Sequence, residues 1–76
     1  MELDKFVTDF ASCFEDTDIS VFSGKTAFKE LDEWDSLTTL AIMGMCSKKY
    51  GVNLSGGEIH NAETVEDIYN LVVSKK

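Results

Sequence analysis

Apolar side chains near the start of the chain recur every three or four residues, the spacing that places them on one face of an α-helix. This face comprises Leu3, Phe6, Val7, Phe10, Cys13 and Phe14. The pattern predicts a helix over residues 3–14. No period is sustained across residues 15–35, and a structureless loop of that length is uncommon in a compact domain. We therefore expect this segment to be functional or to pack against the helices, with a helical turn near residues 26–31.

A second helix is predicted over residues 36–50. Asp35 and Ser36 are both residue types that favour the N-cap of a helix, and Gly51 is a common stop after a last turn. Lys48 and Lys49 precede this glycine, where the helix dipole favours cations. The boundaries of this helix are therefore well marked in the sequence.

Two further helix starts follow. Ser55 and Glu58 have the spacing of a capping box, which predicts a short helix over residues 56–61. Thr64 and Asp67 have a similar arrangement at the start of a final amphipathic helix. We expect an all-α fold, a small four-helix bundle of three longer helices and one short helix with a long first loop. Residues 1–76 are expected to form a single domain.

The predicted second helix is apolar around most of its circumference, although so small a domain cannot easily enclose a helix completely. Its apolar positions separate into two stripes. One comprises Thr39, Ile42, Met43, Cys46 and Tyr50, and the other comprises Leu37, Leu40, Ala41 and Gly44. One stripe is expected to face the core. The other either forms an exposed partner site or is covered by the long loop, and periodicity alone does not decide between these alternatives.

The chain is acidic, with 14 acidic and 7 basic side chains and a net charge of −7. This balance argues against binding to nucleic acid or to an anionic membrane surface and favours partners with basic faces. Cys13 and Cys46 lie in apolar helical patterns, which indicates a reduced, cytoplasmic chain. No apolar run approaches the ~20 residues of a membrane span. Residues 1–5 lack the pattern of a signal peptide.

The hydroxyl of Ser36 is expected to be exposed, because it follows an irregular loop at the start of a helix. A helix N-terminus favours a phosphate group, so a phosphodiester on Ser36 would be well placed. Asp32, Glu33 and Asp35 would then attract a basic partner. The alternative is that Ser36 serves only as an N-cap.

The chain resembles an acyl carrier protein, a family that also includes peptidyl carrier domains. The family's attachment motif stands here as Asp35-Ser36-Leu37, and the resemblance covers essentially the whole chain. It implies that a phosphopantetheinyl transferase moves 4'-phosphopantetheine from coenzyme A onto Ser36. A loading enzyme would then attach an acyl or aminoacyl group to the arm as a thioester, for downstream transferases or synthases. Such tethering gives a high effective concentration of substrate. The resemblance thus implies a non-catalytic carrier, and a monomer is expected.

The resemblance also implies two groups of site residues. The partner-docking surface would comprise Asp32, Glu33, Asp35, Leu37, Leu40, Ala41, Gly44, Ser47 and Lys48. A cavity for the acyl chain would be lined by Phe28, Ile42, Met43, Cys46, Leu54, Ile59 and Ile68. The alternative for the second group is ordinary core packing, because apolar side chains at helical spacing are usually core. Trp34 could either anchor a partner or plug the loop against the core.

The second helix departs from the pattern of carriers in central fatty acid synthesis, which usually have several acids there. Residues 36–50 contain none, and Lys48 and Lys49 stand among them. The chain therefore looks like a stand-alone carrier of a dedicated polyketide, nonribosomal peptide or surface-polymer pathway. The alternatives are a general fatty acid synthesis carrier and an acidic helical interaction module that is never modified.

An enzyme is not expected. The only histidine, His60, has no nucleophile placed beside it by any sequence pattern. Cys13, Cys46 and His60 lack the paired spacing of zinc ligands, so no metal site is expected.

Overall fold

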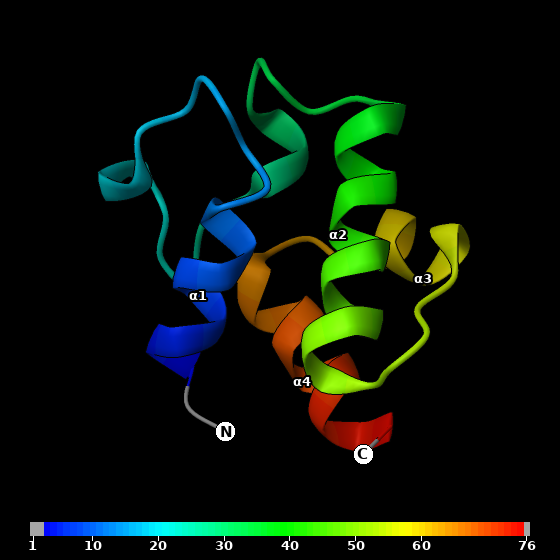
Figure 1. The fold of residues 1–76 in the computed structure, drawn as a ribbon. Helices are drawn as coiled ribbons and strands as arrows, with labels where there is room; N and C mark the ends of the chain where they lie inside the picture. The colour runs from blue at the N-terminus through cyan, green and yellow to red at the C-terminus, as the bar shows by residue number, and fades with distance from the viewer. Residues whose placement is uncertain (1–2, 76) are drawn as a thin grey trace.

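The predicted all-α class is confirmed by the structure, a computed structural model that describes residues 3–75. Figure 1 shows the order of its elements along the chain. The helices are α1 (Leu3–Ala11), α2 (Ser36–Tyr50), α3 (Gly56–Asn61) and α4 (Val65–Lys75), and two 3₁₀ turns, η1 (Ile19–Val21) and η2 (Phe28–Glu30), lie between α1 and α2. Helix α1 packs against α4 and α2, and α3 packs against α2. Within residues 3–75 there is no strand.

The boundaries of α2 and α3 agree with those expected, because local hydrogen bonds set them. Gly51 ends α2 in the left-handed conformation, with a φ of 68°, which glycine adopts without steric cost. Ser55 begins α3 with a complete capping box, in which its hydroxyl accepts from the Glu58 amide and its amide donates to the Glu58 carboxylate. The Asp67 amide donates to the hydroxyl of Thr64 in the corresponding place at the start of α4.

Helix α1 is shorter than predicted. It ends at Ala11 instead of Phe14, because the chain tightens there into turns in which each amide bonds three residues back. The amide of Cys13 donates to the carbonyl of Phe10 over 3.1 Å, and that of Phe14 donates to Ala11 over 3.0 Å. The ring of Phe14 is still buried. The apolar stripe therefore continues through a turn, and spacing alone overestimates the length of the helix.

The loop over residues 15–35 packs against the helices, which is one of the two alternatives expected from the sequence. Phe22 and Phe28 from this loop are buried, and η2 lies within the expected helical turn at residues 26–31. The loop is also joined to the start of α4 by backbone hydrogen bonds. The amide of Glu66 donates to Gly24 over 2.8 Å, and that of Val65 donates to Thr26 over 3.2 Å.

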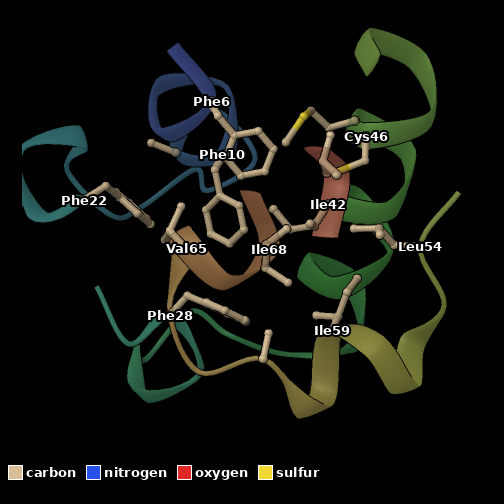
Figure 2. Packing of buried hydrophobic residues seen from close by; sticks show 14 of the residues in the cluster. Phe6, Phe10, Phe22, Phe28, Ile42, Cys46, Leu54, Ile59, Val65 and Ile68 are labelled. Atoms are coloured by element: carbon tan, nitrogen blue, oxygen red, sulfur yellow. The ribbon is translucent and has the colours of Figure 1, made fainter. Parts of the chain in front are cut away.

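The core is a single cluster to which every helix contributes (Figure 2). Aromatic rings from α1 and the loop fill one part of it, where the ring centroids of Phe10 and Phe28 lie 5.3 Å apart in an edge-to-face arrangement. Aliphatic side chains of α2, α3 and α4 fill the rest. The most deeply buried of these residues are Phe6, Phe10, Phe28, Ile42, Cys46, Ile59, Val65, Ile68 and Val72.

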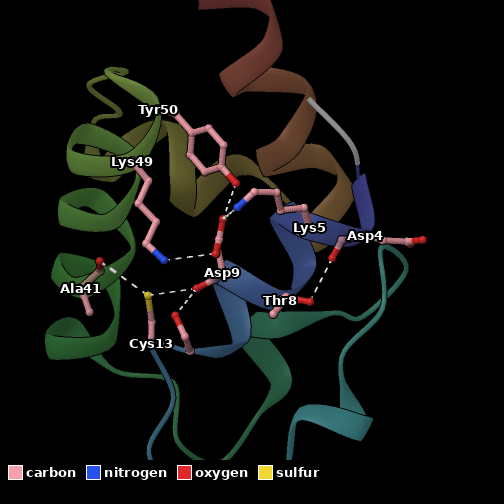
Figure 3. Close-up of polar contacts among 9 residues, drawn as sticks. Asp4, Lys5, Thr8, Asp9, Cys13, Ala41, Lys49 and Tyr50 are labelled. Atoms are coloured by element: carbon pink, nitrogen blue, oxygen red, sulfur yellow. Dashed lines mark hydrogen bonds and ion pairs between the residues drawn. The ribbon is translucent and has the colours of Figure 1, made fainter.

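One buried carboxylate links α1 to the last turn of α2 (Figure 3). Asp9 is only 7% exposed. It accepts a hydrogen bond from the Tyr50 hydroxyl and another from Lys49 Nζ at 3.1 Å, and Lys5 Nζ lies 3.7 Å away. The hydrogen bond from Tyr50 lowers the pKa of Asp9, burial opposes this change, and the charges of Lys49 and Lys5 add to it. Burial, together with the Asp9 carboxylate, raises the pKa of Tyr50.

We expect Asp9→Asn to lower the free energy of unfolding by about 1–3 kcal/mol, because it weakens hydrogen bonds to a buried charged group. Asp4→Asn is the control, since Asp4 is an exposed acid on the same helix. It should change stability by about 0.5 kcal/mol or less. Urea denaturation at neutral pH measures both variants, and equal stability of the two would contradict the role of Asp9.

The same comparison has a defined pH dependence. The folded-state pKa of Asp9 lies below its ordinary value of 3.8. The carboxylate therefore contributes fully to the free energy of unfolding at any pH above that value. The contribution is lost as the pH falls through the depressed pKa. The stability difference between wild type and Asp9→Asn should therefore be constant near neutrality and close in acid. A difference that widens on acidification would contradict the assigned direction.

Candidate functional site

Ser36 is the first residue of α2 and is exposed. The start of α2 is the upper end of that helix in Figure 1. The helix is capped by Asp35, whose Oδ1 accepts from the Thr38 amide at 2.9 Å and from the Thr38 hydroxyl at 3.0 Å. These bonds hold the pKa of Asp35 below its ordinary value. The alternative in which Ser36 serves as the N-cap is therefore wrong. Its hydroxyl is not needed to close the helix end.

Glu33 was expected to contribute charge to a docking surface, but its carboxylate is bonded within the molecule. It accepts hydrogen bonds from the amides of Glu15 and Asp16, at 2.7 and 3.0 Å. The hydroxyl of Thr17 donates to it at 2.8 Å. Desolvation raises the pKa of Glu33, but the bond from Thr17 and those from the backbone outweigh it, so the net direction is downward.

Asp32 differs from both of these acids. It is exposed, and within residues 3–75 its carboxylate makes no hydrogen bond or ion pair. Of the three acids before α2, it is the one whose charge and oxygen atoms both remain available to a basic partner. Asp35 is also exposed, but its Oδ1 is already used in the cap.

The outward face of α2 is the stripe that begins at Leu37. Leu37 is 74% exposed and Leu40 is 60% exposed, whereas Ile42 and Cys46 on the other stripe are completely buried. The alternative in which the long loop covers the stripe that begins at Leu37 is therefore wrong. The exposed positions on this face are Leu37, Leu40, Ala41, Gly44, Ser47 and Lys48.

The residues expected to line an acyl cavity instead pack in the core. All are buried except Met43, which is half-buried; they are Phe28, Ile42, Met43, Cys46, Leu54, Ile59 and Ile68. Burial also raises the pKa of the Cys46 thiol to about 11. The core-packing alternative therefore describes the structure.

A groove of about 520 Å³ lies instead at the surface between α2 and α3, next to Ser36. Its lining includes only Met43 and Ile59 from the expected cavity. The complete lining is Lys29, Trp34, Ser36, Thr39, Leu40, Met43, Gly56, Ile59 and His60. Sequence reasoning missed this groove, because no local pattern shows where α3 settles against α2.

Trp34 forms one wall of this groove and also closes the loop against the core. Its ring stacks on Phe14 with centroids 6.3 Å apart and meets Phe28 edge to face at 4.8 Å. The plugging role considered for Trp34 is therefore observed. His60 is exposed on the rim, where its carbonyl accepts from Lys29 Nζ at 2.6 Å.

Within residues 3–75, no group of three or more His, Cys, Asp or Glu side chains is arranged to hold a metal ion. In the same part of the chain, no helix combines the length and apolarity needed to cross a bilayer. Comparison with family models, curated proteins and solved structures gives no match to the chain.

The orientation of α2 can be tested by two truncations on its opposite faces. Ile42→Ala should lower the free energy of unfolding by about 2–5 kcal/mol, because it leaves a cavity in the core. Leu40→Ala removes a side chain that is 60% exposed and should cost about 0.5 kcal/mol or less. Urea denaturation of both variants measures the difference. A larger loss from Leu40→Ala would contradict the outward position of this stripe.

Proposed function

We propose that this chain is a non-catalytic carrier that holds acyl or aminoacyl groups as thioesters on a 4'-phosphopantetheine arm attached to Ser36. The observation that carries the proposal is that Ser36 is exposed at the first position of a helix already capped by Asp35. Because the cap does not use this hydroxyl, modification would leave the start of the helix intact.

Attachment of the arm to Ser36 is a balanced phosphoryl transfer, and the helix end favours its product. The Ser36 oxygen would form the new bond to phosphorus, and the adenosine bisphosphate half of coenzyme A would leave as the old bond to phosphorus breaks. The serine proton would pass to a base of the transferase. The positive end of the α2 dipole would favour the resulting phosphodiester. The arm would supply the thiol that carries cargo as a thioester.

The outward face of α2 supports docking of the transferase, of a loading enzyme and of downstream transferases or synthases. Leu37 and Leu40 are the two most exposed large apolar side chains among the described residues, ahead of Ile19, Val21 and Val73. Farther along the helix, a side-chain carbon added at Gly44 would meet no atom within 4 Å, so a partner can approach the backbone there. Asp32 adds an available negative charge near the attachment point.

The surface groove supports a place for the arm or for short cargo beside Ser36. Trp34, Leu40 and Met43 give its wall an apolar character. Cargo in the interior would instead have to displace completely buried side chains such as Phe28 and Ile42. The groove is therefore the better candidate for sheltering cargo.

The charge pattern of α2 favours a dedicated polyketide, nonribosomal peptide or surface-polymer pathway over general fatty acid synthesis. The exposed end of the helix presents Lys48, and Lys49 is bonded to Asp9, so a partner built for an acidic helix would find no match. Cys13 and Cys46 are both free thiols, which supports a reducing, cytoplasmic setting. An unmodified interaction module would use the same face of α2, and modification distinguishes it from a carrier.

Incubation with coenzyme A, magnesium and a broad-specificity phosphopantetheinyl transferase, followed by intact mass measurement, tests the proposal. Wild type should gain one arm, and Ser36→Ala should gain none. Ser74→Ala is the control, because Ser74 is an exposed serine of α4 and lies outside the outward face of α2. It should be modified like wild type. A folded wild type without mass gain, or a Ser36→Ala variant that still gains the arm, would rule out the carrier.

A further inference from the structure

We propose that Glu33 is a positioning residue for the modification of Ser36, which it serves by fastening the segment after α1 to the start of α2. This inference rests on the proposed carrier function. It assigns to Glu33 a role different from that of a docking charge, because its carboxylate is already bonded within the chain.

The carboxylate of Glu33 binds three consecutive residues of the loop that follows α1. Oε2 accepts from the Glu15 amide at 2.7 Å, and Oε1 accepts from the Asp16 amide at 3.0 Å and the Thr17 hydroxyl at 2.8 Å. Hydrogen bonds to a charged acceptor are stronger than those between neutral groups. Donors on both oxygens also fix the orientation of the carboxylate plane. The loop and the residue three positions before Ser36 are therefore held together.

The backbone of Glu33 is bonded to α2 at the same time. Its carbonyl accepts from the Thr38 hydroxyl at 3.0 Å, and Thr38 is only 7% exposed. The same hydroxyl lies 3.0 Å from Asp35 Oδ1, so its single proton is shared between the Glu33 carbonyl and the helix cap. Glu33 thus connects the loop, through its side chain, to the first turn of α2, through its carbonyl.

The two residues between Glu33 and Ser36 are also fixed in place by contacts with the rest of the protein. Trp34 stacks on Phe14, which directly precedes the loop that Glu33 binds. Asp35 caps α2. Loss of the Glu33 carboxylate would release the outermost of these contacts while leaving the cap and the ring in place. We therefore expect a folded protein whose serine is less well oriented for transfer.

Asp32 provides a matched control for charge. It carries the same charge as its neighbour Glu33, but its carboxylate makes no hydrogen bond or ion pair within residues 3–75. If the acids before α2 act only by attracting a basic transferase, neutralising either one should have a similar effect that salt weakens. If Glu33 positions Ser36, the two variants should differ.

The test compares Glu33→Gln with Asp32→Asn in single-turnover transfer of the arm from coenzyme A. Glutamine keeps the size of the side chain but replaces one acceptor oxygen with an NH₂ group, which cannot accept from an amide. We expect Glu33→Gln to reduce the transfer rate at saturating transferase about tenfold. This is the change in rate that corresponds to the free energy of one charge-assisted hydrogen bond. The concentration for half-maximal rate should change little. Asp32→Asn removes a docking charge, so it should instead raise the transferase concentration for half-maximal rate, while the saturating rate stays within about twofold.

A spectroscopic readout reports the bonds directly. The amide proton resonances of Glu15 and Asp16 should move upfield in Glu33→Gln and stay in place in Asp32→Asn. Thr17→Val removes a donor from the other side of the contact while leaving the charge of Glu33 unchanged. It should slow transfer in the same direction by a smaller factor, and it serves as the test if Glu33→Gln does not fold.

The possible outcomes separate this inference from the proposed function. If wild type accepts no arm, the carrier function fails, and the role of Glu33 fails with it. If wild type is modified but Glu33→Gln reacts as fast as Asp32→Asn at saturation, only the positioning role is overturned. A salt-sensitive loss of equal size in both variants would also overturn it in favour of charge attraction.

Discussion

The site depends on how firmly the chain is held just before α2. Asp35 caps the helix, Trp34 stacks on the core, and the Glu33 carboxylate binds the loop after α1. These contacts come from three consecutive residues, and none of them uses the hydroxyl of Ser36. The serine can therefore be exposed at a fixed helix start, where a phosphate group would be favoured.

The size of the domain explains why α2 presents an apolar face to solvent. With 76 residues, the chain cannot surround this helix, so only the side that carries Ile42 and Cys46 enters the core. The opposite side leaves Leu37 and Leu40 exposed beside Ser36. The attachment point of the arm and the face that partner enzymes recognise would thus lie on the same helix. Asp9 holds the far end of that helix to α1, so both of its ends are fixed.

The features that could be predicted from the sequence are those set by neighbouring residues. The limits of α2 and α3 followed from cap and stop residues such as Gly51 and Ser55, whose hydrogen bonds are local. The end of α1 could not be placed, because the apolar stripe runs on through a turn to Phe14. The groove and the contacts of Glu33 also escaped sequence reasoning, since they join segments that are distant along the chain.

The central claim is that Ser36 is the attachment point of a prosthetic arm. Fragmentation mass spectrometry of the chain isolated from its own cells tests this claim most directly, because it locates any modification on a single residue. We expect a phosphodiester-linked 4'-phosphopantetheine group on Ser36. A chain in which Ser36 is uniformly unmodified, or in which the arm is on another residue, would contradict the account.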